Sequence, residues 1–179
     1  MRGVVLITGA MAAGKSTVAQ ALAERLPRAA HVRGDVFRRM IVSGREEYDP
    51  GAGGEGAAQL RLRYRLSAAT ADTYAEAGFT AVVQDVVLGA ELAAYVRLVR
   101  TRPLYVVVLA PSAEAVAARE AGRAKTGYGT GAGAWTVERL DGVLRARTPR
   151  LGLWVDSSEL TVGETVEAIL AGRERARVD

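Results

Sequence analysis

The chain of 179 residues contains no cysteine and a single histidine, His31. The absence of cysteine excludes disulfides, zinc–thiolate sites and thiol nucleophiles, and it is typical of a reducing, cytoplasmic location. No apolar run reaches membrane-spanning length. The first residues lead directly into a strand-like run, so we expect no signal peptide. The length suits a single domain over residues 1–179 with a full hydrophobic core.

Lysine is also scarce, since Lys15 and Lys125 are the only lysines among the 24 basic residues. The net charge of +4 is therefore carried almost entirely by arginine. The densest basic clusters lie at residues 61–65 and 173–177, and the second has the pattern of a frayed, solvated helix end. Nucleic-acid grooves usually interleave clustered basic residues with aromatic residues for stacking. The charge pattern favours solvated surface and an anion site over a nucleic-acid groove.

Five apolar runs predict strands at residues 3–8, 30–34, 80–84, 104–110 and 151–155. Helical patterns separate these runs, and strands that alternate with helices predict an α/β fold with a parallel sheet and right-handed crossovers. Ser112 is expected to cap one helix. Thr161, followed three residues later by Glu164, has the capping-box pattern and is expected to start the last helix.

The most informative motif directly follows the first predicted strand and has the form G-x-x-x-x-G-K-S. Its residues are Gly9, Ala10, Met11, Ala12, Ala13, Gly14, Lys15 and Ser16, and Thr17 opens the helical pattern behind them. Strand, glycine loop and helix together are the context of a phosphate-binding loop.

Each residue type in this loop has a physical reason. The two glycines allow backbone angles that a Cβ would forbid, and they let the chain approach an anion closely. Backbone N–H groups and the helix dipole then favour phosphate. We expect Lys15 to reach the β- and γ-phosphates and Ser16 to offer its hydroxyl to Mg²⁺.

Polar residues at the ends of the other predicted strands are the next candidates, because open α/β sheets bind ligands beyond the carboxyl ends of their strands. These residues are Asp35, Gln84, Asp85 and Asp156. Asp35 could accept the proton of an attacking hydroxyl, or it could simply cap the following helix. Asp85 ends an apolar run like a Walker B acid, which predicts contact with Mg²⁺ or with substrate.

Two further features predict a lid over the site. Arg119 and Arg123 are four residues apart, so one helix face could present both guanidinium groups to a transferring phosphoryl group. Glycine-rich segments at 43–56 and 126–133 are either plain loops or segments that close over the ligands. We expect His31 to be packed or exposed at the surface rather than catalytic, and Trp135 and Trp154 to anchor the core.

Taken together, the phosphate loop, Asp35 with nearby Arg38, the strand that ends at Gln84 and Asp85, and the pair Arg119 and Arg123 resemble the small P-loop kinases. The resemblance is to the chloramphenicol phosphotransferase-like and zeta-toxin-like AAA-type phosphotransferases, with gluconate and shikimate kinases more distant. It implies a five-stranded parallel sheet of order 2-3-1-4-5, with ATP as donor and Mg²⁺ as cofactor.

The same resemblance implies roles for single residues. Asp35 matches the base that faces the acceptor hydroxyl, with Arg38, Gln84 and Asp85 on the substrate side. Arg119 matches a lid arginine over the adenine, and Arg123 matches one that contacts phosphate. The lid would span about 119–134 and the acceptor-binding segment about 36–65, while the stretch 149–158 would border the adenine. The acceptor-binding segment departs from these families in detail, so the resemblance names no acceptor.

Three functions remain open from the sequence. The first is an ATP-dependent kinase, monomeric or homodimeric, that phosphorylates an alcohol group of a small molecule such as an antibiotic or a metabolite. The second is a nucleotide or polynucleotide-end kinase, for which Arg61, Arg63 and Arg65 would supply positive charge. The third is a non-catalytic module that switches partners with bound nucleotide.

Overall fold

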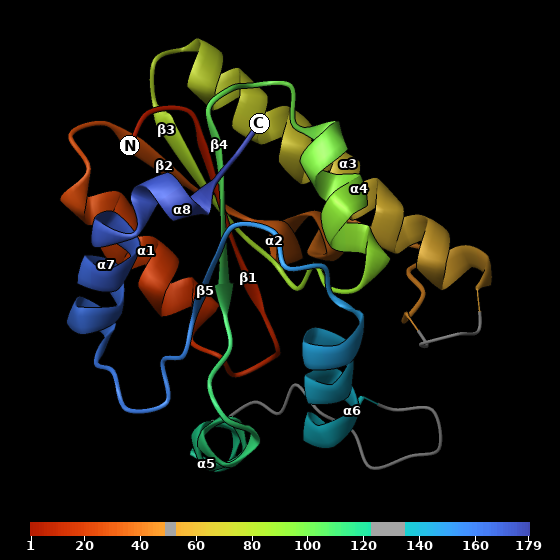
Figure 1. The fold of residues 1–179 in the computed structure, drawn as a ribbon. Helices are drawn as coiled ribbons and strands as arrows, with labels where there is room; N and C mark the ends of the chain where they lie inside the picture. Colours follow the sequence, from red (N-terminus) through yellow and green to blue (C-terminus); the bar gives the residue numbers. More distant parts are fainter. Residues whose placement is uncertain (49–52, 123–134) are drawn as a thin grey trace.

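The computed structural model describes residues 1–48, 53–122 and 135–179. In this part of the chain one sheet carries helices on both faces (Figure 1). The strands are β1 (Val4–Gly9), β2 (Ala29–Arg33), β3 (Thr80–Gln84), β4 (Leu104–Leu109), β5 (Leu153–Val155) and β6 (Arg177–Val178). The helices are α1 (Lys15–Arg25), α2 (Gly34–Arg39), α3 (Gly54–Glu76), α4 (Ala90–Leu98), α5 (Ala113–Ala121), α6 (Val137–Gly142), the π-helical turn η1 (Val143–Arg147), α7 (Val162–Ala171) and α8 (Arg173–Ala176).

The sheet has the order β2-β3-β1-β4-β5, and all neighbouring strands on this path are parallel. The five-stranded parallel α/β sheet expected from the sequence is therefore confirmed. The short β6 is additional, and it pairs antiparallel with β4. With β1 in the middle of the order, the loop that follows β1 lies at the centre of the carboxyl edge.

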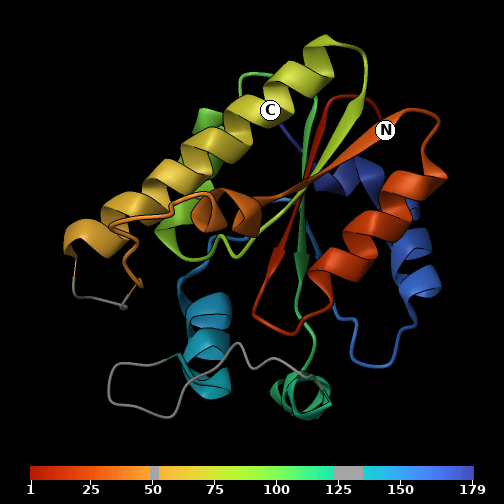
Figure 2. The ribbon, with the colours of Figure 1, turned by 180° about the vertical axis from the view of Figure 1, so that it is seen from behind.

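The helices form two outer layers. In Figures 1 and 2, α1, α7 and α8 cover one face of the sheet, and α3 and α4 cover the other. Helices α5 and α6 lie beyond the carboxyl ends of β1 and β4, while both chain termini lie at the opposite end of the sheet (Figure 1). The carboxyl edge is thus the region where helices and loops can enclose a ligand.

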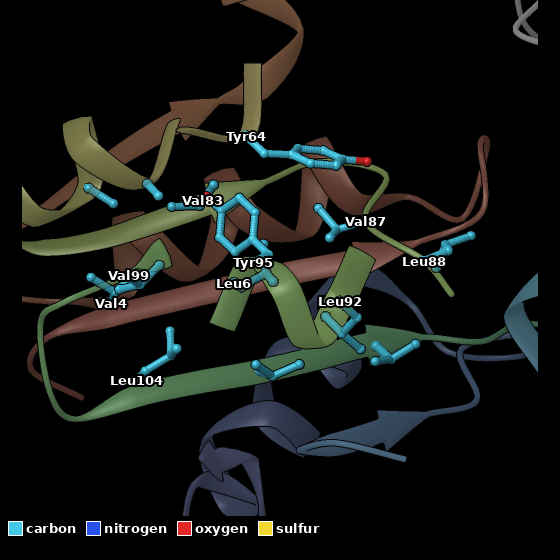
Figure 3. Packing of buried hydrophobic residues seen from close by; sticks show 14 of the residues in the cluster. Val4, Leu6, Tyr64, Val83, Val87, Leu88, Leu92, Tyr95, Val99 and Leu104 are labelled. Atoms are coloured by element: carbon cyan, nitrogen blue, oxygen red, sulfur yellow. The ribbon is translucent and has the colours of Figure 1, made fainter. Parts of the chain in front are cut away.

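Alternate residues of β1 divide between the two layers of core. Val4 and Leu6 pack in the cluster on the α3 and α4 side, and Val5 and Ile7 pack in the cluster on the α1 and α7 side. All four are fully buried, as expected for a central strand covered on both faces. Figure 3 shows the first cluster, where Tyr64 meets Tyr95. Their ring centroids are 5.8 Å apart in an edge-to-face arrangement, which favours the ring quadrupoles.

Local sequence signals set several helix ends. The Ser112 side chain accepts a hydrogen bond from the Ala115 N–H at the start of α5, as predicted. Thr161 and Glu164 form the predicted capping box at the start of α7. These bonds satisfy N–H groups that have no partner within the helix.

The structure corrects several of the predicted boundaries. Gly34 was expected to end a strand but begins α2, and residues 151–152 precede β5. Residues 54–56 were expected in a loop but form the first turn of α3, because the apolar face of this long helix packs on the sheet and overrides the glycines. The charged residues at 173–177 are exposed as expected. The stretch is not a frayed end, however, because Ala176 is fully buried and Arg177 begins β6.

None of the helices in the described ranges is long and apolar enough to cross a membrane.

Candidate active site

The phosphate-loop motif forms the connection between β1 and α1. Gly14 caps α1 with a φ of 88°, a left-handed conformation that glycine adopts without the steric cost of a Cβ. Lys15 is only 8% exposed, and its ammonium Nζ donates a hydrogen bond of 2.7 Å to the Ala10 carbonyl. The lysine therefore curls back over the loop that it belongs to.

The start of α1 has the properties of an anion site. Its first turn holds no acidic residue, so the N–H groups and the positive end of the helix dipole are unopposed. Ser16 and Thr17 are exposed there. This donor set fits a phosphate group, and the Ser16 hydroxyl fits a Mg²⁺ ligand.

A magnesium ion at this place would depend on the nucleotide for further ligands. In the described residues no group of three acidic or histidine side chains could hold a metal. Mg²⁺ commonly combines one or two protein ligands with phosphate oxygens and water, which is compatible with Ser16.

Thr8, the residue before the motif, ties the phosphate loop to the segment that follows β3. Its hydroxyl donates to the Val87 carbonyl at 2.9 Å and accepts from the Val87 N–H at the same distance. Both residues are fully buried. Two hydrogen bonds in the core hold the two sides of the carboxyl edge in a fixed relation.

Asp35 is the second residue of α2, immediately beyond the end of β2. Its carboxylate Oδ2 lies 3.1 Å from Arg39 Nη2, and Oδ1 lies 3.8 Å from Arg33 Nε, beyond hydrogen-bond distance. Oδ1 is shielded from solvent and has no hydrogen-bond partner among the described residues. A carboxylate oxygen in this state can accept a proton or a hydroxyl hydrogen bond from a ligand.

Arg38 and Glu47 form an ion pair across the turn from α2 into the next segment. The Arg38 side chain is 32% exposed and the Glu47 side chain 83% exposed. Arg38 was predicted to contact the acceptor, and the structure places it close to Asp35 on the same short helix but with its guanidinium group already paired.

Asp85 is buried next to Arg63 of α3. Its carboxylate accepts a 2.7 Å hydrogen bond from Arg63 Nε, pairs with Arg63 Nη2, and accepts a 2.7 Å bond from the Val86 N–H. A Cβ at Gly34 would overlap the Asp85 carboxyl group, so glycine is needed there for close approach. Both oxygens of the predicted Mg²⁺ or substrate ligand are thus engaged with Arg63.

A cavity of about 440 Å³ opens beside Asp35. Met11 of the phosphate loop lies on its wall with Asp35, Arg38 and Arg63, and Leu60 and Tyr64 of α3 line it together with Tyr48 and Trp135. We call this space the Asp35 cavity. About half of its lining residues come from the predicted acceptor-binding segment 36–65, and Met11 of the phosphate loop lies on the same wall.

Tyr64 is a fixed part of the wall of this cavity. Its hydroxyl donates a 2.7 Å hydrogen bond to the Val86 carbonyl. Burial raises the pKa of the Tyr64 hydroxyl, so this group stays protonated and keeps its role as a donor. Burial also lowers the pKa of Arg63, and the negative charge of Asp35 is among the influences that raise it.

A second cleft, of about 230 Å³, lies on the other side of the phosphate loop. Its wall includes Gly14, Thr17, Arg119, Ser157 and Thr161, and we call it the Ser157 cleft. Arg119 Nη2 donates to the Ser157 carbonyl at 2.5 Å and to the Ser158 carbonyl at 3.2 Å. Arg119 therefore lies beside the stretch 149–158 that was expected to border the nucleotide base.

The remaining residues predicted for the site lie away from the wall of the Asp35 cavity or outside the described residues. Gln84 is buried at the last position of β3 and, like Asp85, is not on the wall of the Asp35 cavity. Asp156 is exposed, and hydrogen bonds from Ser158 lower its pKa. Arg123 and the segment 126–133 lie outside the described residues, as does most of the expected lid. The roles assigned to these residues remain predictions.

The sequence predicts packing or surface exposure for His31 and core packing for the two tryptophans. His31 is half-buried, and its Nδ1 lies 2.8 Å from Gln20 Oε1. Trp135 and Trp154 both pack partly buried against the core. Trp135 also lines the Asp35 cavity, which the sequence analysis did not foresee.

The site also contains residues that sequence reasoning did not select for it. Arg63, Tyr48 and Glu91 line the Asp35 cavity, although they come from separate segments of the chain. The only available signal was the alternation of arginine and apolar residues at 61–65, where a helical period would turn Arg63 away from its exposed neighbours Arg61 and Arg65.

Comparison with protein families gives a clear assignment. Residues 4–149 match the AAA domain family AAA_33. The match covers most of the chain, so this protein belongs to that family. None of the curated proteins matches the chain.

Solved structures share the fold over nearly the whole length. A sugar kinase from Janibacter sp. HTCC2649 has 18% identity and a TM-score of 0.68, with 98% of this chain and 96% of that chain covered. A gluconokinase from Sinorhizobium meliloti 1021 has 19% identity and a TM-score of 0.67, with coverages of 98% and 94%. The APS kinase of Mycobacterium tuberculosis, in complex with AMPPNP and APS, has 17% identity and a TM-score of 0.66, with coverages of 97% and 98%. At these identities the likeness shows the fold of small P-loop kinases.

Proposed function

We propose that this protein is an ATP-dependent phosphotransferase that moves the γ-phosphoryl group to a hydroxyl group of a small molecule. The observation that carries the proposal is the position of Asp35. Its carboxylate lies on the wall of a cavity that also contains Met11 of the phosphate loop, and its Oδ1 has no hydrogen-bond partner in the described structure. A carboxylate placed between an acceptor-sized cavity and a phosphate loop suits a kinase base.

The phosphate loop, Asp35 and Ser16 have separate roles in the proposed reaction. The main-chain N–H groups from Gly9 to Ser16 and the Lys15 ammonium hold the phosphates and offset their negative charge. Asp35 orients the acceptor hydroxyl and accepts its proton as the oxygen bonds to the γ-phosphorus. The bond from that phosphorus to the bridging oxygen breaks, and ADP leaves. Ser16 would hold Mg²⁺, which would offset part of the negative charge of the phosphates when bound.

The Ser157 cleft is the proposed place of the nucleoside. It shares Gly14 and Thr17 with the phosphate loop, and Arg119 lies on its wall. A nucleoside there and an acceptor in the Asp35 cavity would meet the phosphate loop from opposite sides. Arg123 is proposed to contact the phosphates from the lid.

The alternative of a polynucleotide-end kinase loses its main support. Arg63 of the basic cluster is paired with Asp85 inside the protein, whereas Arg61 and Arg65 are exposed. The three arginines therefore do not form one basic surface for a nucleic-acid chain.

The proposal is tested with the variant Asp35→Asn and the control Asp179→Asn, the same change at an exposed residue of the C-terminus. We expect Asp35→Asn to lower transfer from ATP by about 10²–10⁴-fold. Binding of MgATP, measured by calorimetry, should change little in either variant, because Asp35 faces the acceptor. Full transfer activity in Asp35→Asn would remove this residue from the mechanism.

A further inference from the structure

The Asp35 cavity has a wall that is mainly apolar. More than half of the described residues that line it are aliphatic or aromatic. Aliphatic side chains reach it from different segments, among them Met11, Ile41, Leu60 and Leu88. Such a wall offers few hydrogen-bond partners to a ligand that carries hydroxyl groups on all sides. It favours a ligand that buries apolar surface against it.

Two aromatic rings reinforce this character. Tyr48 and Trp135 lie 87 positions apart by their residue numbers, yet their ring centroids are 6.3 Å apart with an interplanar angle of 33°. Both rings line the cavity. Tyr48 is 36% exposed and Trp135 is half-buried, so each ring keeps surface that a ligand can cover. Flat apolar groups gain the most from such rings.

The described wall carries four carboxylates and two guanidinium groups. Beside the wall, the Arg139 guanidinium lies 5.4 Å from the Trp135 ring centroid. Each guanidinium group on the described wall already has a carboxylate partner, because Arg38 pairs with Glu47 and Arg63 pairs with Asp85. Glu46 and Glu91 add further carboxylates to the wall. An anionic acceptor would have to displace an existing partner and approach these carboxylates, and both steps cost free energy. A neutral or cationic ligand avoids both costs.

We propose that the acceptor is an uncharged or cationic alcohol with a large apolar, ring-containing body. The body occupies the apolar part of the Asp35 cavity against Tyr48 and Trp135, and the hydroxyl reaches Asp35. This inference rests on the proposed function, and it sets sugar acids and phosphate-bearing acceptors apart from the substrate. The chemical step is unchanged: the hydroxyl oxygen bonds to the γ-phosphorus, its proton goes to Asp35, and ADP leaves.

The test uses three probes with one indole skeleton and different charges. Tryptophanol is cationic, 3-(indol-3-yl)propan-1-ol is neutral, and indole-3-lactate is anionic, while gluconate serves as a polar anion without a ring. Binding to the full chain in the presence of MgATP is measured by calorimetry, and transfer is measured by ADP release. We expect the cationic and neutral indoles to bind about tenfold or more tightly than indole-3-lactate and gluconate. Equal or tighter binding of either anion overturns the inference.

Two variants separate the apolar contribution to probe binding from the electrostatic contribution. Trp135→Ala should weaken the neutral indole severalfold, whereas Trp154→Phe, a change on β5 away from the wall, should leave it unchanged. Glu91→Gln keeps the side-chain shape and removes one charge, so it should reduce the preference for tryptophanol over indole-3-lactate. Far-UV circular dichroism checks that each variant folds. An unchanged preference in Glu91→Gln, together with unchanged affinity in Trp135→Ala, contradicts the proposed binding mode.

The outcomes for the two proposals are distinguishable. If the chain binds MgATP and transfers phosphate to gluconate but not to the indole alcohols, the inference fails and the kinase proposal stands. If none of the three indoles binds to a chain that binds MgATP, the inference again fails alone. If MgATP itself does not bind, the proposed function fails before the acceptor is considered.

Discussion

The phosphate loop and the Asp35 cavity lie at the same edge of the sheet but are built from different kinds of sequence. The loop is one contiguous stretch between β1 and α1, and its lysine is held by the loop's own Ala10 carbonyl. The cavity is assembled from residues of α2, α3, the segment after β3 and the chain near Trp135. Contiguous sites keep their geometry through local backbone conformation, whereas assembled sites depend on how distant elements pack.

This difference has a functional consequence. Under the proposed function, the phosphate loop can keep its conformation while the Asp35 cavity, which would select the acceptor, changes with the packing of α2 and α3.

The largest expected effect is on the phosphate-loop side. Lys15→Met removes the ammonium group and should lower transfer by about 10²–10³-fold or more, because the proposed function assigns this charge to the phosphates. Binding of the acceptor probe should remain, since Lys15 is not on the wall of the cavity. Steady-state ADP release and calorimetry with 3-(indol-3-yl)propan-1-ol measure the two effects. Equal losses in transfer rate and in affinity for the acceptor probe would show that the phosphate loop and the Asp35 cavity do not act separately.

The next largest expected effect is on stability, at the ion pair of Arg63 and Asp85. Arg63→Met leaves the buried Asp85 carboxylate without its partner, and we expect a loss of about 3–5 kcal/mol in the free energy of unfolding. The double variant Arg63→Met with Asp85→Leu should recover much of this loss, because no buried charge is left unpaired. Urea unfolding of Arg63→Met and of the double variant measures the two free energies of unfolding.

The same pair decides the role of Asp85. If Asp85→Asn weakens MgATP binding while leaving the free energy of unfolding unchanged, Asp85 is a metal ligand, one of the two roles that the sequence pattern predicts. The geometry supports the opposite result, in which stability falls and MgATP affinity holds.

A smaller effect is expected at Gly34, where β2 turns into α2. Gly34→Ala places a Cβ against the Asp85 carboxyl group, and overpacking of this kind costs about 1–3 kcal/mol. The matched change Gly163→Ala in α7 meets nothing within 4 Å and should stabilise the protein by about 0.5–1 kcal/mol. Thermal unfolding of the two variants should therefore shift in opposite directions. If the unfolding temperature shifted with the same sign in both variants, the Asp85 carboxyl group would have to move aside for the new Cβ at little cost.

The smallest effect is a pH dependence at His31. Burial lowers the pKa of His31, Arg33 lowers it further, and Asp35 raises it. The unfolded chain therefore binds this proton more readily than the folded chain, so stability is lost as pH falls through the ordinary titration range of histidine. His31→Gln should lose this part of the pH dependence. Because the chain has one histidine, the difference between the two urea-unfolding profiles isolates it; identical profiles would contradict the assignment.

Sequence reasoning succeeded where the signal was local. The five parallel strands were predicted within a few residues, whereas the short β6 was not, and the phosphate loop and the caps at Ser112 and Thr161 were read from adjacent residues. The pair of Arg63 and Asp85 was not found, because the two residues come from α3 and the end of β3 and meet only when the helix packs on the sheet. Residues 54–56 were misread as loop for the same reason, since the glycine pattern is local and the packing of α3 is not.

The most direct test of the account is a single-turnover experiment. ATP labelled on the γ-phosphate is mixed with excess chain and a panel of 3-(indol-3-yl)propan-1-ol, glycerol, gluconate and adenosine. The account predicts that label enters one of these alcohols at the same rate as ADP appears, and that ADP formation slows sharply when the panel is left out. Release of the label only as inorganic phosphate, at a rate that does not depend on the panel, would contradict it.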